Sequence, residues 1–231
     1  MNRIAIIPAR GGSKRIPKKN LKGFLGRPIL AYSIEAALTS GLFDEVMVST
    51  DDDEIAEVAI RFGASIPFRR SIKNSDDFAT TVEVLFEVLQ MYKAEGKQFE
   101  YGCCIYPTAP FVTSSKLKQA FDVLTNGNFD SVFPVLKYSY PIQRSLRFEG
   151  DRIKMVYPEH LNSRSQDLEA TYHDSGQFYW FSTDALINKK KMFTDNAMGI
   201  LTSELEAQDI DTEVDWKLAE LKFELIRTQN A

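Results

Sequence analysis

The 231-residue sequence contains very little cysteine and histidine. Its only cysteines, Cys103 and Cys104, are adjacent, and neighbouring residues of a strand point to opposite faces, which argues against a disulfide between them. Two histidines, His160 and His173, are too few to favour a histidine-based metal site. We therefore expect two small apolar cysteines in a reduced compartment, in a chain long enough to fold without disulfides or a structural metal.

The sequence also lacks a long apolar run. No segment approaches the roughly 20 apolar residues that a membrane-spanning helix requires, and the first ten residues are charged too early for a signal peptide. We therefore expect a cytoplasmic protein with no membrane partner. The composition is 44% hydrophobic and 26% charged, which is typical of a globular protein and excludes disorder, collagen and coiled coil as the main state. The length predicts a single domain over residues 1–231.

Acidic residues are absent from residues 1–34, although this segment holds eight of the 28 bases. All 32 acids therefore lie in the rest of the chain, which is strongly acidic. A basic patch with glycine on an acidic body favours a compact polyanion such as a nucleoside triphosphate, whereas a nucleic-acid partner would favour a broadly basic domain. We expect no nucleic-acid partner. On charge alone, a solvated basic loop is the alternative.

Short apolar runs alternate with helical patterns along most of the chain. Strands are predicted at 4–8, 45–50, 65–69, 102–106, 131–136 and 178–181, and helices at 29–38, 53–63, 80–93, 114–124 and 214–226. This alternation predicts an α/β fold with a doubly wound, mostly parallel sheet. Residues 138–172 break the pattern and contain a predicted hairpin around 149–151, so we expect a small arm there.

The first candidate for chemistry is residues 8–20 (PARGGSKRIPKKN), directly after the first strand. The Gly11–Gly12 pair lets backbone N–H groups turn toward an anion, and Ser13 adds a hydroxyl donor. The spacing matches neither a P-loop nor G-x-G-x-x-G, but ligands of α/β sheets bind at the carboxyl ends of strands. Three bases of this segment can neutralise phosphates: Arg10, Lys14 and Lys19.

The second candidate is a pair of carboxylates two residues apart, Asp209 and Asp211. In an extended segment they point to the same side and can share a hard cation such as Mg²⁺. The alternative is an acidic turn that caps the last helix, with Asp211 or Thr212 as N-cap. Spacing alone favours the interpretation as a helix cap over that as a metal site. A phosphate loop elsewhere in the chain makes the metal site more competitive, because nucleotide chemistry usually needs a metal.

Two further candidate segments lie next to predicted strands, one at the end of the strand at 102–106 and one before the strand at 178–181. Residues 106–110 (YPTAP) form a rigid turn from which Thr108 can contact a ligand. Residues 173–177 (HDSGQ) contain Ser, His and Asp, but there is no nucleophile elbow, and three neighbouring residues rarely converge into a triad. Gly176 is better interpreted as a site of close backbone approach to a ligand.

Taken together, these segments resemble the CMP-nonulosonate synthetases, cytidylyltransferases that activate sialic acids and their bacterial relatives. The matching segments are residues 7–20 (IPARGGSKRIPKKN), 48–52 (VSTDD), 68–81 (FRRSIKNSDDFATT), 106–110 (YPTAP), 174–180 (DSGQFYW) and 208–216 (QDIDTEVDW). They span nearly the whole chain in order. YPTAP replaces the QPTSP typical of sialic acid enzymes, and with residues 173–181 (HDSGQFYWF) it is most similar to members that use pseudaminic acid.

The resemblance implies a reaction in which the anomeric hydroxyl of the sugar attacks the α-phosphate of CTP with Mg²⁺, giving CMP-sugar and pyrophosphate. It implies catalytic roles for Arg10, Lys19 and Asp211, and metal ligation by Asp209 and Asp211. The positions that match nucleotide-binding residues are Ala9, Arg10, Gly11, Gly12, Ser13, Lys14, Lys19, Asn20, Arg70 and Thr81, with Arg69 as the alternative to Arg70. The positions implied for the sugar are Tyr106, Thr108, Arg164, Gly176, Gln177 and Phe178.

The resemblance also implies a Rossmann-like nucleotidyltransferase fold and a homodimer. The insertion at 138–172 would contact the partner subunit, with Arg164 as the candidate for binding the sugar carboxylate in the neighbouring site. Other acid sugars, namely sialic, legionaminic or 3-deoxy-octulosonic acid, remain alternative substrates. A non-catalytic nucleotide-sensing protein is the alternative of another class, and the intact Asp209/Asp211 pair argues against it.

Overall fold

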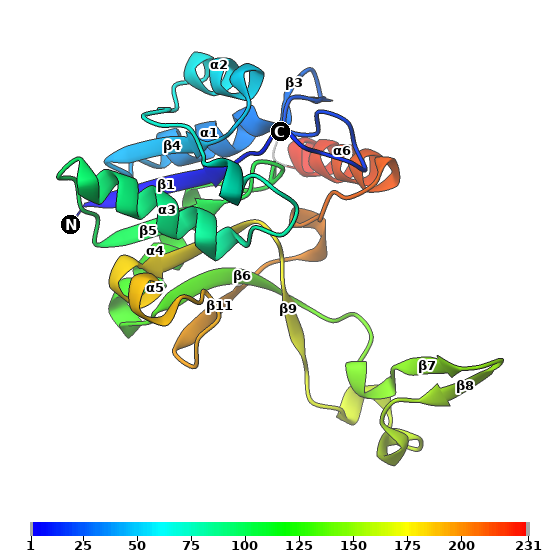
Figure 1. The fold of residues 1–231 in the computed structure, drawn as a ribbon. Helices are drawn as coiled ribbons and strands as arrows, with labels where there is room; N and C mark the ends of the chain where they lie inside the picture. The colour runs from blue at the N-terminus through cyan, green and yellow to red at the C-terminus, as the bar shows by residue number, and fades with distance from the viewer. Residues whose placement is uncertain (1, 230–231) are drawn as a thin grey trace.

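A computed structural model describes residues 2–229 of the chain. At its centre is a seven-stranded sheet in the order β11-β6-β10-β5-β1-β4, with β9 paired to β6 (Figure 1). Strands β4, β1 and β5 run parallel, as do β11 and β6, whereas β10 is antiparallel to both β5 and β6. The sheet strands are β1 (Arg3–Pro8), β4 (Glu45–Ser49), β5 (Tyr101–Ile105), β6 (Ser131–Lys137), β9 (Tyr172–Asp174), β10 (Phe178–Ser182) and β11 (Ala197–Leu201).

Helices cover both faces of the sheet, which confirms the predicted doubly wound α/β fold. Three of them, α1, α2 and α4, pack on one face, and α3 and α5 pack on the other. The two adjacent cysteines divide between these two cores, Cys103 in the first and Cys104 in the second, and both are free. The helices are α1 (Ile29–Ser40), α2 (Asp53–Arg61), α3 (Thr81–Ala94), α4 (Ser114–Gly127), α5 (Thr183–Lys189) and α6 (Glu213–Gln229).

Local signals set several of these boundaries. Helix α3 begins at a capping box, in which Thr80 Oγ1 accepts from the Glu83 N–H and the Glu83 carboxylate accepts from the Thr80 N–H. Helix α1 ends at Gly41, whose φ of 62° is left-handed. No helix among residues 2–229 is long and apolar enough to cross a membrane.

The predicted strand at 65–69 is wrong. Only Ser65 pairs with β4, through an isolated bridge to Met47, and the chain then leaves the sheet. Pro67 has no N–H to donate, so the ladder cannot continue. Pro28 is the N-cap of α1 and belongs to a short pairing of β2 (Gly23–Phe24) with β3 (Arg27–Pro28).

A third apolar cluster joins the two ends of the chain. Phe24, Ile16 and Ile29 pack against Trp216 and Ile210, with the Phe24 and Trp216 rings 5.8 Å apart. Burial of these side chains stabilises the contact by about 1.5–3 kcal/mol for each large group. The packing brings the basic N-terminal loop next to the Asp209–Asp211 segment.

The predicted arm projects from the body as a hairpin, β7 (Leu146–Glu149) with β8 (Arg152–Met155), which confirms the expected turn (Figure 1). Leu146, Phe148 and Ile153 are all exposed on it. Residues 2–229 also contain five short 3₁₀ helices: Ile72–Asn74, Ile142–Arg144, Pro158–His160, Ser165–Asp167 and Glu204–Glu206.

Candidate active site

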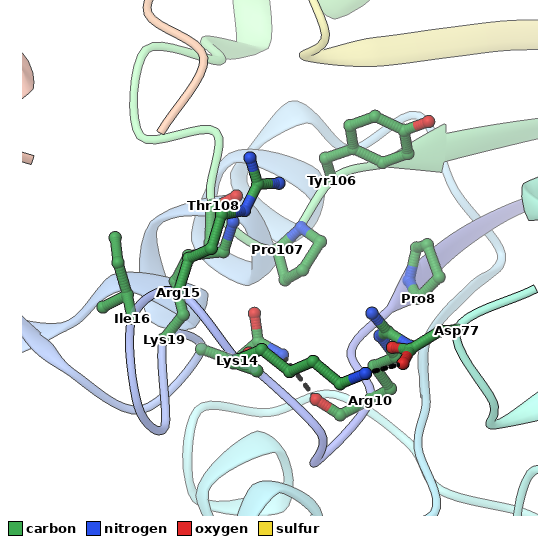
Figure 2. A pocket seen from close by; sticks show the side chains of 12 residues that line it. Pro8, Arg10, Lys14, Arg15, Ile16, Lys19, Asp77, Tyr106, Pro107 and Thr108 are labelled. Atoms are coloured by element: carbon green, nitrogen blue, oxygen red, sulfur yellow. Dashed lines mark hydrogen bonds and ion pairs between the residues drawn. The ribbon is translucent and has the colours of Figure 1, made fainter. Parts of the chain in front are cut away.

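A cavity of about 460 Å³ lies where β1 and β5 end (Figure 2). The loop after β1 supplies most of its polar wall, and the turn after β5 and Asp77, from the segment before α3, complete it. This is the edge at which α/β sheets bind ligands. Its lining residues are Pro8, Arg10, Ser13, Lys14, Arg15, Ile16, Lys19, Asn20, Asp77, Tyr106, Pro107 and Thr108.

Hydrogen bonds fix the backbone of the basic loop. The Ala9 N–H donates to Ser49 O at 2.9 Å, and Asn20 Nδ2 donates to Arg10 O at 2.9 Å. The Gly11 N–H, expected to face an anion, instead donates to Asp51 Oδ1 at 3.0 Å. A Cβ at Gly11 would lie 2.8 Å from a carboxylate oxygen of Asp52, so glycine is required here for close approach, and its φ is not left-handed.

Two cations of the loop, Arg10 and Lys14, converge on an acidic side chain that was not predicted from the sequence. Arg10 Nη1 donates to Asp77 Oδ1 at 2.7 Å, and Lys14 Nζ donates to the other carboxylate oxygen (Figure 2). The hydrogen bonds from Lys14 and Arg10 hold the pKa of Asp77 below its usual value. An anion therefore already lies between the two bases in the structure. The only sequence signal was an acidic pair, Asp76-Asp77, within a segment predicted to lie near the loop.

The Asp209–Asp211 segment closes the other side of the basic loop. Asp211 Oδ1 accepts from Arg15 Nη2 at 2.7 Å, and Lys19 Nζ lies 3.7 Å from the same oxygen. Lys19 Nζ also donates to Ile210 O at 2.7 Å, while the Ile210 side chain is buried in the third cluster. The loop and the carboxylate pair, almost 200 residues apart in sequence, thus form one site.

The cap of α6 is formed by other residues. Asp215 Oδ2 accepts from the Thr212 N–H at 2.7 Å, and the Asp215 N–H donates back to Thr212 Oγ1 at 3.3 Å. Thr212 is therefore the N-cap, one of the two expected for this turn. The helix is thus capped without the carboxylates of Asp209 and Asp211.

Asp209 faces a second cavity of about 580 Å³, also lined by Ser175, Gly176 and Lys222. Burial, and then the nearby charge of Asp211, raises the pKa of Asp209. No group of three or more potential metal ligands occurs among residues 2–229. Mg²⁺ is nevertheless commonly held by one or two carboxylates completed by substrate phosphates and water, and the Asp209/Asp211 pair fits that pattern.

The residues expected to bind the sugar are distributed unevenly. Tyr106 and Thr108 line the first cavity, and the Tyr106 hydroxyl lies 3.2 Å from Thr81 Oγ1. Burial raises the pKa of Tyr106 to about 12, so its hydroxyl is neutral at physiological pH.

Gly176, with a left-handed φ of 64°, lines the second cavity. The side chain of Gln177 is buried, donates to Glu206 O at 2.6 Å, and leaves its Oε1 without a partner among the described residues.

Three of the expected sugar-site residues line neither cavity of their own subunit: the buried Gln177, Phe178 and Arg164. Phe178 is fully buried in the first core, because alternate residues of β10 face opposite sides of the sheet, so it does not line the site. Its neighbour Tyr179 faces the other side and packs near Tyr106. Arg164 belongs to the 138–172 segment that contains the hairpin, and it is exposed and paired with Asp167 at 2.7 Å.

The structure also distinguishes the two adjacent arginines. Arg70 is buried, with its Nε donating to Ser49 Oγ at 3.1 Å, and it lies close enough to Arg10 for the two charges to repel. Burial is the main cause that lowers the pKa of Arg70. Arg69 turns outward and pairs with Asp53. Arg70 is therefore the arginine on the side of the basic loop.

A lysine of the last helix fixes the segment that leads to Asp209. Lys222 Nζ donates to Glu204 O at 2.8 Å, to Ala207 O at 2.9 Å and to Gln208 Oε1 at 2.9 Å. These bonds use all three of its donors. Burial lowers the pKa of Lys222. The sequence analysis missed this contact, since a lysine within an amphipathic helix carries no local signal of its tertiary partner.

A basic loop at the end of β1, a cavity beside it and a carboxylate, Asp211, in contact with that loop are the features expected of a nucleotidyltransferase. In fold, the chain is similar to the solved structure of a CMP:2-keto-3-deoxy-manno-octonic acid synthetase complexed with CTP, with a TM-score of 0.69 and 16% identity over 99% of this chain and 100% of that one. The chain belongs to the cytidylyltransferase family, whose model matches residues 4–222.

Two curated relatives of almost the same length as this chain match it from end to end. It is 39% identical over 226 residues to a pseudaminic acid cytidylyltransferase of Campylobacter jejuni, covering 97% of each chain. It is 33% identical over 235 residues to a CMP-N,N'-diacetyllegionaminic acid synthase of Legionella pneumophila, again covering 97% of each. Identity at this level over the full length confirms the resemblance in the sequence motifs.

Proposed function

We propose that this chain couples CTP to a nonulosonic acid, with pseudaminic acid as the preferred sugar, and releases pyrophosphate. The observation that carries the proposal is the contact between the basic loop and Asp211, in which Arg15 and Lys19, two residues that line the first cavity, both meet the Asp211 carboxylate. This arrangement places cations for a triphosphate beside carboxylates for a metal. Identity to pseudaminic acid cytidylyltransferases supports the choice of sugar.

The loop residues act by positioning and by neutralising charge. Transfer at phosphorus spreads negative charge over phosphate oxygens, and most catalysis of such steps comes from orientation and electrostatic stabilisation. Arg10 and Lys14 reach into the cavity from one side and Lys19 from the other. They would hold the triphosphate in line with the incoming hydroxyl and stabilise pyrophosphate as it leaves.

Asp209 and Asp211 would hold Mg²⁺, which supplies charge neutralisation at phosphate and lowers the pKa of a coordinated hydroxyl. Each carboxylate faces a different part of the site. Asp211 is paired with bases of the first cavity, and Asp209 lines the second. We infer that the nucleotide occupies the first cavity and the sugar the second, with the carboxylate pair between them.

Backbone groups next to β1 would read the cytosine base. The Ala9 N–H and the Arg10 carbonyl already have partners within the protein, which leaves the Ala9 carbonyl and the Arg10 N–H for the base edge. Fixed backbone groups discriminate well, because an ill-matched base leaves them unpaired.

The choice of sugar is tested by turnover of several nonulosonic acids at matched concentrations. We expect pseudaminic acid to react faster than N-acetylneuraminic acid, because Tyr106 replaces a glutamine typical of sialic acid enzymes and its neutral hydroxyl is engaged by Thr81. The measurement is pyrophosphate release with CTP held saturating. Faster turnover of N-acetylneuraminic acid would overturn this assignment of the sugar.

Asp77 is predicted to compete with the nucleotide. In Asp77→Asn the bases Arg10 and Lys14 lose their internal counter-ion, so we expect the dissociation constant for CTP to fall about three- to tenfold at low salt. Calorimetric titration of CTP measures the change. Asp53→Asn is the matched control, because Asp53 also pairs with an arginine, Arg69, but away from the cavity. Weaker binding by Asp77→Asn would show that Asp77 positions the bases instead.

The arm is proposed to form the contact between two subunits. Its exposed apolar side chains favour an interface, and its Arg164 lines neither of the two cavities of its own subunit. In a homodimer the arm would place Arg164 at the sugar carboxylate of the neighbouring site.

A further inference from the structure

Helix α6 has apolar side chains on two opposite faces. Trp216 and Ala219 are buried against the body, at 3% and 0% exposure. The opposite face carries a stripe of four residues whose exposed fractions range from 41% to 75%: Val214, Leu218, Leu221 and Leu225. A surface helix normally presents charged and polar residues on the face away from its core. The stripe is therefore an apolar surface that the folded chain leaves uncovered.

The spacing of the stripe is that of a helix–helix seam. Its members follow one another at intervals of four, three and four residues, the a/d pattern of paired helices. Helix α6 lies at the periphery of the molecule, well separated from the hairpin arm (Figure 1). A second helix can thus approach the stripe without involving the arm.

The charges beside the stripe select an antiparallel copy of the same helix. If Leu218 of one copy packs opposite Leu221 of the other, Lys217 lies opposite Glu224 of the other copy, and the two-fold axis repeats this pair. Both side chains are exposed, and neither has a described hydrogen bond or ion pair. Parallel pairing would instead bring Lys217 toward Lys222 of the other copy.

We propose that α6 is a second self-association surface, on which two copies of this chain pair through antiparallel α6 helices. The occupant of the stripe is then a second copy, and the contact is distinct from the one assigned to the arm. Four apolar layers bury less surface than a permanent interface requires, so the association is reversible and depends on concentration. It does not depend on the proposed reaction.

The test uses charge reversal on the purified full-length chain. Sedimentation equilibrium is run over a wide range of protein concentration for the wild type, Lys217→Glu, Glu224→Lys, and an equal mixture of the two variants. We expect each single variant to associate about tenfold more weakly, because like charges meet at both ends of the contact. The mixture restores wild-type association, because every pair is then again of opposite sign.

A second pair of variants separates the stripe from general surface effects. Leu221→Glu should abolish the concentration-dependent step, whereas Ile60→Glu on α2, at 60% exposure against 63% for Leu221, should leave it unchanged. Circular dichroism confirms that both variants remain folded. The proposal is overturned if the apparent molecular mass of the wild type increases with protein concentration no more than that of the Leu221→Glu variant. It is also overturned if the mixture of Lys217→Glu and Glu224→Lys associates no better than either variant alone.

Discussion

Asp211→Asn is expected to lower kcat by at least about tenfold, and by orders of magnitude if Mg²⁺ is held as proposed. The change keeps the size of the side chain but removes a negative charge where a metal would supply several kcal/mol of transition-state stabilisation. Stability should change little, because Thr212 and Asp215 cap α6 without Asp211. The lost ion pair to Arg15 is largely exposed and contributes about 0–1 kcal/mol.

Glu213→Gln is the matched control for Asp211→Asn. It removes the same charge two residues away, where the carboxylate pairs with Lys22 outside the first cavity. We expect near-normal kcat for this variant. Steady-state turnover at saturating Mg²⁺ and thermal unfolding together decide the outcome. If Asp211→Asn keeps more than about a tenth of wild-type kcat, a loss of under roughly 1.4 kcal/mol, Asp211 is not a metal ligand in the reaction.

Arg164→Ala is expected to reduce kcat/KM for the sugar by at least about thirtyfold, which corresponds to roughly 2 kcal/mol for removing a charged partner of a carboxylate. The effect should appear only in the sugar parameters, since Arg164 does not line the cavity beside the nucleotide loop. Lys154→Ala, which removes another exposed positive charge from the same arm, serves as control. Initial rates at varied sugar and saturating CTP measure the change.

Mixing two defective variants tests whether Arg164 acts in the neighbouring subunit. A heterodimer of Arg164→Ala and Asp211→Asn chains contains one site in which both residues are intact. An equal, fully exchanged mixture should therefore recover about a quarter of wild-type activity. Recovery no greater than the sum of the two variants would show that Arg164 serves its own subunit or no site. Light scattering that finds the active enzyme monomeric would also contradict the proposal.

Most of the sheet and helices follow from local pattern. The long helix α3 combines apolar spacing with a Thr80–Glu83 capping box, so periodicity and cap agree on its start. Helix α5 and strand β11 were not predicted, because they have seven and five residues and little periodicity. The spacing of α6 identified its apolar positions but could not say which of its two apolar faces would be buried.

The parts of the candidate site that are short sequence motifs could be predicted. The contacts between residues far apart in the sequence were harder to predict, because only the fold brings those residues together. The basic loop and the Asp209/Asp211 pair each stand out as short motifs. By contrast, Asp77 pairs with bases about 65 residues away in the sequence, and Lys222 donates to backbone carbonyls. Neither contact has a local signature in the sequence. Phe178 illustrates the opposite error, since its position beside polar site residues concealed that its side chain faces the core.

Product analysis with the wild-type chain tests the central claim most directly. The chain is incubated with Mg²⁺, pseudaminic acid and either CTP or UTP, and nucleotide-sugar and pyrophosphate are quantified by mass spectrometry and a coupled assay. We predict CMP-sugar and pyrophosphate in equal amounts with CTP, and at least about tenfold slower formation with UTP, a difference of about 1.4 kcal/mol. Equal turnover of UTP, or no pyrophosphate with CTP and any nonulosonic acid, would contradict the account.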